Sequence, residues 1–171
     1  MNKTDNYLDK HRDIIVFFKK KKFSSIVEIG VGLGDIIRNI NSNNKLFLDI
    51  DKNVLNANKF LSYFNNIGCQ NSNFNEFDIY KNNLSGKFDL IIMVNWIHNI
   101  ELNILQNKFN TFINNNLNDE GYLIFDIVEN KKYKHNHTID DLLKGINNID
   151  ILIPDKQYEY NRKLIYVRLN K

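Results

Sequence analysis

The chain has 171 residues, of which 43% are hydrophobic and 25% are charged, and its formal net charge is +3 at pH 7. These values are close to globular averages and exclude a chain that is disordered throughout or built as a fibrous repeat. No apolar run approaches the ~18 residues that a membrane-spanning helix needs, and the N-terminus lacks the apolar stretch of a secretory signal. The single cysteine, Cys69, cannot form an internal disulfide, and we interpret it as a small buried apolar residue. We therefore expect one cytoplasmic domain, residues 1–171, with no membrane partner.

The charge is distributed unevenly along the chain. Residues 1–22 and residues 131–171 each carry a net charge of +4, whereas residues 23–130 carry −5. Two basic ends around an acidic centre favour an anionic partner. The alternative, a solvated surface without a specific partner, also accounts for such runs of charge.

The first predicted element is a helix. Between residues 7 and 18 the apolar side chains recur at intervals that place them on one helical face, and Lys19–Lys22 follow as its polar end. Residues 26–29 form a short β-rich run closed by glycines, which predicts a buried strand. The next predicted elements are a helix at 35–40, a strand at 45–50 and a helix at 52–64.

The second half of the chain continues this alternation. The near-continuous apolar run at 88–94 is typical of a parallel strand covered on both faces. Helical spacing predicts a helix over 102–113, and a turn at Asn118–Gly121 precedes a predicted strand at 122–128. The remaining predicted elements are a short helix at 139–146 and two antiparallel strands at 149–153 and 163–169, joined around Pro154. Strands that alternate with helices indicate βαβ units and an α/β fold with a parallel sheet.

A glycine-rich turn follows the first predicted strand. It reads Glu28-Ile-Gly30-Val-Gly32-Leu-Gly34-Asp35, and Asp49 ends the second predicted strand nineteen residues after Gly30. Glycines let the backbone pass close to a ligand and present amide groups at a helix N-terminus. In such a fold the tip of the second strand lies beside this turn, where a carboxylate accepts both hydroxyls of an adenosine ribose. The pattern predicts a site for a nucleoside cofactor.

The spacing of the glycines narrows the choice of cofactor. Dinucleotide-binding turns have the pattern G-x-G-x-x-G, but Asp35 stands at the position of the third glycine. The turn also lacks the lysine and hydroxyl pair of a P-loop. Glu28 would repel a pyrophosphate and suits a cationic ligand, such as the sulfonium and ammonium groups of S-adenosylmethionine.

From residue 24 to residue 169 the sequence resembles the class I S-adenosylmethionine-dependent methyltransferases. Five segments carry the resemblance: Val27–Gly34, Leu48–Asp51, Asn73–Phe74, Phe88–Ile100 and Asn118–Ile124. Asn73 stands where the family usually has an acid that contacts the adenine amino group, although an Asn carbonyl can also accept from that group. A single glycine, Gly121, stands where two are usual.

The resemblance implies a Rossmann-like three-layer sandwich whose seven-stranded sheet is mostly parallel and ends in a C-terminal antiparallel hairpin. Within it, residues 1–22 form a helix that caps the pocket, 23–130 the cofactor-binding core, and 131–171 the acceptor loop, a helix and the terminal strands. The implied cofactor is S-adenosyl-L-methionine. The residues implied to bind it are Glu28, Gly30, Gly32, Gly34, Asp49, Ile50, Asn73, Phe74, Asn95 and Trp96.

Methyl transfer from a sulfonium to a nucleophile depends largely on positioning, and a base can remove the acceptor's proton. Three histidines are candidates for that base. His98 follows the fourth strand, where its alternative role is packing under the cofactor; His135 and His137 follow the fifth strand, where the alternative is an exposed polar loop. We predict no metal, because methyl transfer needs none and the acidic positions of the metal-using subfamily are here Asn95 and Trp96.

Four residues are candidates for acceptor binding: Tyr7, His11, Arg12 and Tyr133. The leading helix caps the acceptor pocket in compact members of the family, although Tyr7 and His11 can equally form its packed face. Trp96 is either an aromatic wall of the site or a core anchor.

The favoured function is methylation of O or N on a small polar acceptor, such as a metabolite or sugar derivative, and the basic ends favour one that carries phosphate. An RNA methyltransferase is the first alternative: the pI near 8.8 permits it, but no binding module is appended. The N/D-P-P-[FYW] signature of base-amino methylation is also missing, because Trp and Ile follow Asn95. The second alternative is a non-catalytic partner subunit that binds the cofactor.

Overall fold

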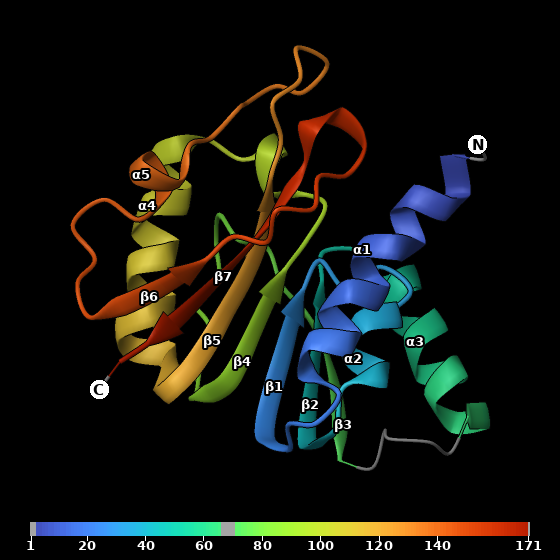
Figure 1. Ribbon diagram of the computed structural model, residues 1–171. Helices are drawn as coiled ribbons and strands as arrows, with labels where there is room; N and C mark the ends of the chain where they lie inside the picture. The colour runs from blue at the N-terminus through green and yellow to red at the C-terminus, as the bar shows by residue number, and fades with distance from the viewer. Residues whose placement is uncertain (1–2, 66–70, 171) are drawn as a thin grey trace. The chain divides into compact units, whose positions relative to one another are not determined.

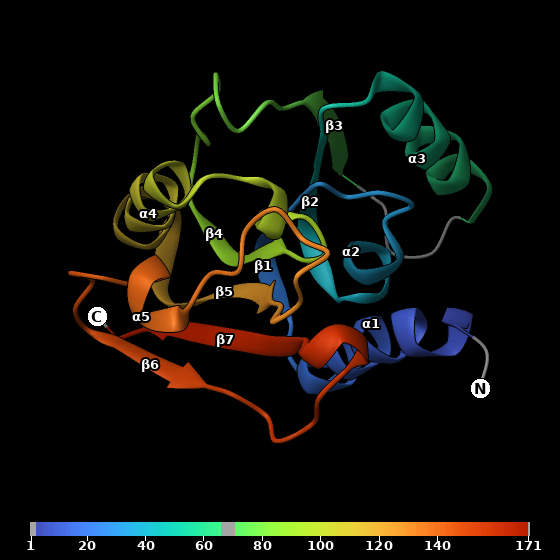
Figure 2. The same ribbon diagram turned by 90° about the horizontal axis from the view of Figure 1, so that it is seen from above.

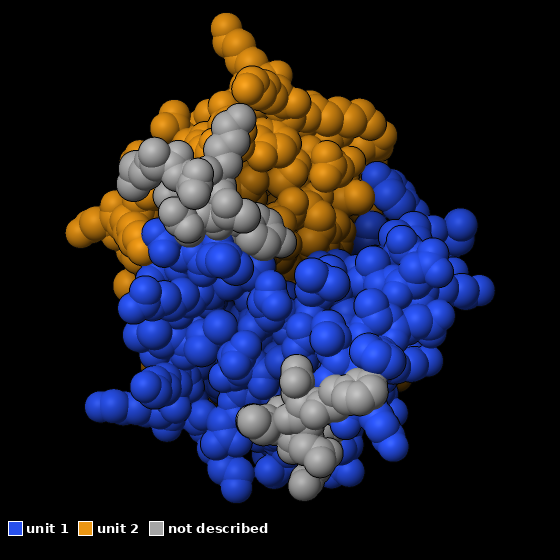
Figure 3. Space-filling model, turned by 90° about the vertical axis from the view of Figure 1, so that its right-hand side faces the viewer, with its two compact units in different colours: residues 1–83 blue, residues 84–171 orange. Residues whose placement is uncertain are grey.

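The computed structural model describes residues 3–65 and 71–170, in two compact units formed by residues 1–83 and 84–171 (Figure 3). Cys69 lies outside the described residues, so its predicted burial stays a prediction. Among the described helices, none combines the length and the apolar character that crossing a membrane requires.

The first unit alternates helices and strands in the predicted order (Figure 1). Its elements are α1 (Lys3–Phe18), β1 (Phe23–Ile29), α2 (Asp35–Asn39), β2 (Ser42–Asp49), α3 (Lys52–Asn65) and β3 (Ser72–Glu76). The three strands are parallel, with β2 between β1 and β3. Ile26, Val27 and Ile29 of β1 are buried, so burial of these β-branched side chains stabilises the strand.

The register of these strands brings their carboxyl ends to one edge. Glu28 of β1 is paired with Phe47 of β2, and Asp49 of β2 with Glu76 of β3. Each strand therefore ends within a residue or two of its neighbour. The loops that follow the three strands, including the glycine turn, emerge at this edge.

Over its described residues, the second unit contains four strands, and its longest helix spans Leu102–Thr111. Its elements are β4 (Phe88–Met93), η1 (Ile97–Asn99), α4 (Leu102–Thr111), the π-helical η2 (Phe112–Asn116), β5 (Leu117–Ile127), α5 (Ile139–Leu142), β6 (Ile149–Leu152), η3 (Glu159–Asn161) and β7 (Lys163–Leu169). β4 and β5 are parallel, whereas β7 pairs antiparallel with both β5 and β6. Figures 1 and 2 show α5 beside α4, where Nε2 of Gln106 donates to the carbonyl of Asp141 at 2.7 Å.

The strand order in the seven-stranded sheet is β3-β2-β1-β4-β5-β7-β6. Over the described residues the sheet is mixed and mostly parallel, and the antiparallel pairs lie among its C-terminal strands. This confirms the predicted α/β class, the seven strands and the C-terminal antiparallel hairpin.

Several element boundaries differ from the predictions; β1 and β2, for example, each begin three residues earlier than predicted. Asn118–Gly121, predicted as a turn before the strand, lies within β5 as an irregularity, because Phe88 pairs with Leu117 while Leu90 pairs with Tyr122. The predicted helix over 102–113 continues as a π-helix to Asn116, whose side-chain amide donates to the carbonyls of Leu84 and Gly86. The predicted helix over 139–146 ends at Leu142, before Gly145 takes a left-handed φ of 77°.

Candidate functional site

The glycine loop, residues 30–34, turns the chain sharply between β1 and α2. Gly30, Gly32 and Gly34 have φ values of 70°, 52° and 69°, in the left-handed region that favours glycine. The amides of Gly30 and Val31 both donate to the carbonyl of Leu48, at 2.8 and 3.0 Å, which fixes the loop over the end of β2.

Asp49, the last residue of β2, bonds directly to this loop. Its Oδ2 accepts from the amide of Gly32 at 3.1 Å, and its Oδ1 accepts from the amide of Asp51 at 3.0 Å. Asp51 faces elsewhere, because its Oδ1 accepts from the amide of Asn53 at 2.8 Å in the first turn of α3. The two acids of the second motif therefore have different surroundings: Asp49 lies against the glycine loop, and Asp51 caps a helix.

Glu28 lies behind the loop, only 5% exposed. Its Oε2 accepts from the amide of Ile37 in α2 at 3.0 Å. Burial raises the pKa of Glu28 to about 8, an effect that the Ile37 hydrogen bond partly opposes and the negative charge of Asp35 increases. Glu28 thus supports the first turn of α2 from inside the unit.

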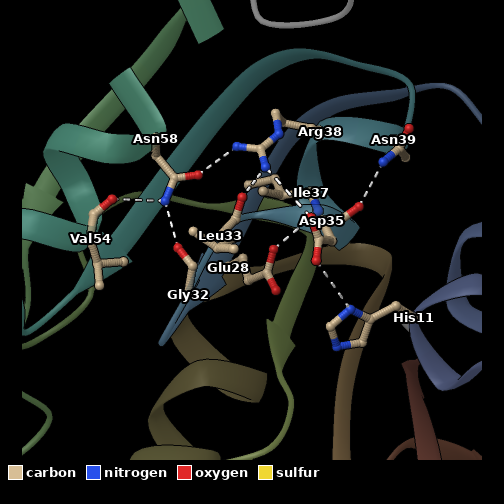
Figure 4. A network of polar contacts seen from close by, with 10 residues as sticks. All are labelled: His11, Glu28, Gly32, Leu33, Asp35, Ile37, Arg38, Asn39, Val54 and Asn58. Atoms are coloured by element: carbon tan, nitrogen blue, oxygen red, sulfur yellow. Dashed lines mark hydrogen bonds and ion pairs between the residues drawn. The ribbon is translucent and has the colours of Figure 1, made fainter. Parts of the chain in front are cut away.

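A polar network holds the carbonyl side of the loop (Figure 4). The side-chain nitrogen of Asn58, fully buried in α3, donates to the carbonyls of Gly32 at 2.6 Å and Val54 at 3.0 Å. Arg38 donates from Nη1 to Oδ1 of Asn58 at 2.7 Å and from Nη2 to the carbonyl of Leu33. Side chains from α2 and α3 therefore bind two consecutive carbonyls of the loop.

The residues predicted to bind the cofactor from the ends of β2 and β3 lie in different settings. Ile50 follows Asp49 and is 64% exposed, and Leu33 in the glycine loop is 61% exposed. Asn73 is paired with Leu46 in the interior of β3, three positions before its end.

Phe74 lies next along β3, and its ring stacks on the buried ring of Phe47 with centroids 4.6 Å apart. Asp78 instead lies just after β3, half-buried, where it accepts from the amide of Tyr80 at 2.9 Å and pairs with Lys81 at 3.0 Å.

The candidates for acceptor binding in α1 differ in their burial. His11 is buried, and its Nδ1 lies 3.9 Å from Oδ2 of Asp35 in α2. Arg12 is exposed on the surface of α1. Tyr7 belongs to α1, but its side chain lies outside the described residues, so its predicted role stays a prediction.

In the second unit, a buried ion pair joins three segments. Asp126 of β5 is fully buried, and its Oδ1 accepts from the amide of Asn95, a residue with φ 81° just after β4, at 2.7 Å. Its Oδ2 pairs with Nη1 of Arg162, which lies just before β7. Nη2 of Arg162 donates to the hydroxyl of Tyr133 at 3.1 Å. Trp96 follows Asn95, half-buried, at the start of η1.

The three histidines proposed as bases differ in their contacts. His98 is buried, with its ring centroid 4.0 Å from that of Tyr133. His137 is buried as well; its Nε2 lies 3.0 Å from the carbonyl of Ile100 and must donate to it, because a carbonyl only accepts. Burial lowers the pKa of His137.

His135 contacts both of the other candidate histidines, His98 and His137. Its amide donates to the carbonyl of His98 at 3.1 Å, and its ring stacks on that of His137 with centroids 5.6 Å apart. Its Nε2 is buried and has no hydrogen-bond partner among the described residues. Within residues 3–65 and 71–170, no three His, Cys, Asp or Glu side chains gather as metal ligands.

Sequence reasoning missed several residues of these networks: Arg38, Asn58, Asp78 and Arg162. The position of Asp78, just after the third strand, is a signal that could have been used. The other three gave none, because each is tied into its network by a contact with a residue 20 or more positions away.

No family model and no curated protein matches the sequence. Solved structures do match it in fold. The N-methyltransferase NodS from Bradyrhizobium japonicum WM9, in complex with S-adenosyl-L-homocysteine (SAH), superposes with a TM-score of 0.78 at 12% identity, over 97% of this chain and 88% of that one. Magnesium protoporphyrin IX methyltransferase (ChlM) from Synechocystis PCC 6803 with bound SAM has a TM-score of 0.75 at 14% identity, over 96% and 80% of the two chains.

A third match is an S-adenosylmethionine-dependent methyltransferase from Clostridium acetobutylicum, with a TM-score of 0.70 at 17% identity, over 98% of this chain and 90% of that one. At these identities the likeness concerns the fold. The three structures share nearly the whole length of the chain.

Proposed function

Because the chain has the fold of the class I S-adenosylmethionine-dependent methyltransferases, we propose that it transfers a methyl group from S-adenosylmethionine to an oxygen or nitrogen of a small polar acceptor. One observation carries the proposal. Asp49, at the carboxyl end of β2, bonds to the amide of Gly32 in the glycine loop that follows β1. An acid and a glycine loop at this edge form the expected place for a nucleoside in an open α/β sheet.

The residues present fit such a cofactor. A Cβ built on Gly32 would meet no atom within 4 Å, so the loop borders open space at this point. Each carboxylate oxygen of Asp49 accepts one backbone amide and has a second lone pair, so the two oxygens can also accept two ribose hydroxyls. The exposed side chains of Leu33 and Ile50 supply apolar surface on the loops after β1 and β2.

We assign the roles from this geometry. Asp49 binds the ribose, the backbone of Gly30, Gly32 and Gly34 lines the cofactor, and Ile50 packs on the adenine. Asp78 is a better candidate than Asn73 for the adenine amino group, because it follows β3 at the edge where Asp49 lies. Glu28 acts through α2, since its carboxylate is buried against Ile37.

S-adenosylmethionine, when bound, supplies a methyl group on a positively charged sulfur. The chain's own contribution is positioning, by a loop whose amides and carbonyls are fixed before the ligand arrives. The acceptor must also lose a proton, and we assign its removal to Nε2 of His135. The Nε2 proton of His137 is instead donated to the carbonyl of Ile100.

The acceptor is proposed to bind at the loop after β5. Tyr133 of this loop is held by Arg162 through its hydroxyl and by His98 through its ring. Its sequence neighbours Lys131, Lys132 and Lys134 are exposed, and their charge favours an anionic group such as phosphate.

Calorimetry with SAH and, in parallel, with NAD⁺ tests the proposed function. Binding of SAH without binding of NAD⁺ supports it, whereas the reverse result would mean a dinucleotide site. A screen of phosphorylated and sugar-linked compounds for SAH release then identifies the acceptor. Titration with bulk RNA at graded salt tests the alternative nucleic-acid substrate.

A further inference from the structure

We propose that Asn58 and Arg38 are positioning residues for the methyl-donor site, which orient the Asp49 carboxylate through the peptide groups of Gly32. The inference rests on the proposed methyltransferase function. Neither residue belongs to the glycine loop or to the strand that carries Asp49, since Asn58 lies in α3 and Arg38 in α2.

Asn58 is oriented without ambiguity. Its side-chain nitrogen faces two carbonyls, those of Gly32 and Val54, which only accept hydrogen bonds. Its Oδ1 faces the guanidinium of Arg38, which only donates. The side chain is fully buried, so any of these groups left unpaired would be costly.

Arg38 makes a similar hydrogen bond to Leu33, the next residue of the loop. Its second nitrogen donates to the carbonyl of Leu33, and it lies 3.7 Å from the carboxylate of Asp35. The carbonyls of Gly32 and Leu33 are therefore both bound by side chains of neighbouring helices (Figure 4).

Gly32 connects this network to Asp49. Its carbonyl accepts from Asn58 at 2.6 Å, while its amide donates to Oδ2 of Asp49 at 3.1 Å. Glycine has few conformational restrictions, so its peptide groups need an external constraint to keep one direction. Asn58 supplies that constraint, and the Gly32 amide then holds one oxygen of Asp49 and leaves its other lone pair for a ligand.

A role of Asn58 limited to the fold and a role in positioning predict different coupling between Asn58 and Asp49 in their effect on SAH affinity. If Asn58 only stabilises the fold, its replacement and that of Asp49 act independently on ligand affinity. If Asn58 acts through Asp49, removing Asp49 abolishes most of the effect of replacing Asn58. A double-mutant cycle on SAH affinity separates the two.

The cycle uses wild type, Asn58→Leu, Asp49→Ala and the double variant, with SAH as the probe and calorimetry as the measurement. We expect Asn58→Leu to weaken SAH binding about tenfold and Asp49→Ala about 10- to 150-fold. The double variant should bind about as weakly as Asp49→Ala alone. Asn56→Leu, at an exposed position of the same helix, is the matched control and should bind like wild type.

Arg38→Met, combined with Asp49→Ala in a second cycle, gives the same test at a half-buried side chain if Asn58→Leu does not fold. Losses of SAH affinity that multiply in the double variants would overturn the positioning role. Unchanged SAH binding by both Asn58→Leu and Arg38→Met would overturn it as well. Either result leaves the proposed function intact. Failure of the wild-type protein to bind SAH would overturn the proposed function, and this inference with it.

Discussion

A Cβ on Gly34 would lie 2.4 Å from Oδ1 of Asn58, closer than two such atoms can approach. The same Cβ would lie 3.1 Å from both a guanidinium nitrogen of Arg38 and the ring of Phe47. Gly34 is also left-handed, with φ 69°. The third glycine of the loop is therefore required by the side chain of α3 that packs against it, as well as by its backbone conformation.

Gly34→Ala should accordingly destabilise the protein. A left-handed alanine alone costs about 1–2 kcal/mol, and displacement of the buried Asn58 adds to that cost. We expect the free energy of unfolding to fall by about 2–4 kcal/mol in urea denaturation. Gly32→Ala is the matched control: φ is 52° there too, but its Cβ meets nothing within 4 Å, so only the backbone strain should appear. Equal losses for the two variants would contradict the packing argument.

Gly32→Arg should abolish SAH binding. The open space beside Gly32 is where we expect the methionine portion of the cofactor, and an arginine side chain would fill it. Gly32→Ala keeps most of that space and should bind SAH measurably. Calorimetric affinity that is the same in wild type and Gly32→Arg would place the cofactor elsewhere.

Asp49→Ala should weaken SAH binding by about 1.5–3 kcal/mol, the range for hydrogen bonds to a charged group, because two ribose hydroxyls lose their partner. Asp51→Ala tests the register of the second motif. It removes the cap of α3, so it should lower the unfolding free energy by about 1 kcal/mol and leave SAH affinity nearly unchanged. If Asp51→Ala proves to be the variant with weak binding, the ribose contact is assigned to the wrong acid.

Much of the fold could be predicted because its signals are local. The strand at Lys163–Leu169 was predicted to the residue from its apolar run, and α2 begins at Asp35 directly after the glycines, as expected. The π-helix at Phe112–Asn116 could not be predicted. Its last turn is held by the side chain of Asn116 through the carbonyls of Leu84 and Gly86, and no local pattern shows such a distant contact.

The candidate site likewise contains residues that the sequence could predict and residues that it could not. The glycine spacing and the acid at the tip of the second strand made the pairing of Gly32 with Asp49 predictable. Asn58 could not be singled out, because it is one of 31 asparagines in the chain and two of its partners, Gly32 and Arg38, lie outside its helix. Asn73 was assigned from motif order alone, and the register of β3 with β2 shows that it lies before the strand's end.

Glu28→Gln should change how stability depends on pH. The pKa of Glu28 is raised from an ordinary 4.5 to about 8, so between these values the folded chain retains a proton that the unfolded chain has lost. The stabilisation from protonated Glu28 is thus complete below pH 4.5 and lost as pH rises through about 8, with a slope of at most about 1.4 kcal/mol per pH unit.

Glu28→Gln keeps an acceptor for the Ile37 amide but cannot ionise, so its unfolding free energy should decline less than that of wild type from pH 5 to pH 8. Urea denaturation across this range is the measurement. Glu129→Gln, at an exposed position, controls for the loss of one negative charge. Parallel pH profiles for wild type and Glu28→Gln would contradict a raised pKa.

The two stacked histidines after β5, His135 and His137, should respond differently to replacement. His137→Ala removes a buried ring and its hydrogen bond to the carbonyl of Ile100, so it should lower the unfolding free energy by about 1–3 kcal/mol at pH 7.5. Because the pKa of His137 is lowered from 6.5, the stability it contributes is present above pH 6.5 and is lost as pH falls below that value. The difference between wild type and His137→Ala should therefore shrink at pH 5.5.

His135→Ala should have the opposite effects. Its ring is only half-buried and its Nε2 has no partner among the described residues, so stability should change little. With the acceptor that the SAH-release screen identifies, the methylation rate should fall about 10²- to 10⁴-fold, the usual contribution of a general base, while calorimetric SAH affinity stays unchanged. A loss confined to the acceptor's KM would instead mean that His135 binds the acceptor without taking its proton. Full activity of His135→Ala would leave His98, whose ring packs on Tyr133, as the remaining histidine candidate for the base.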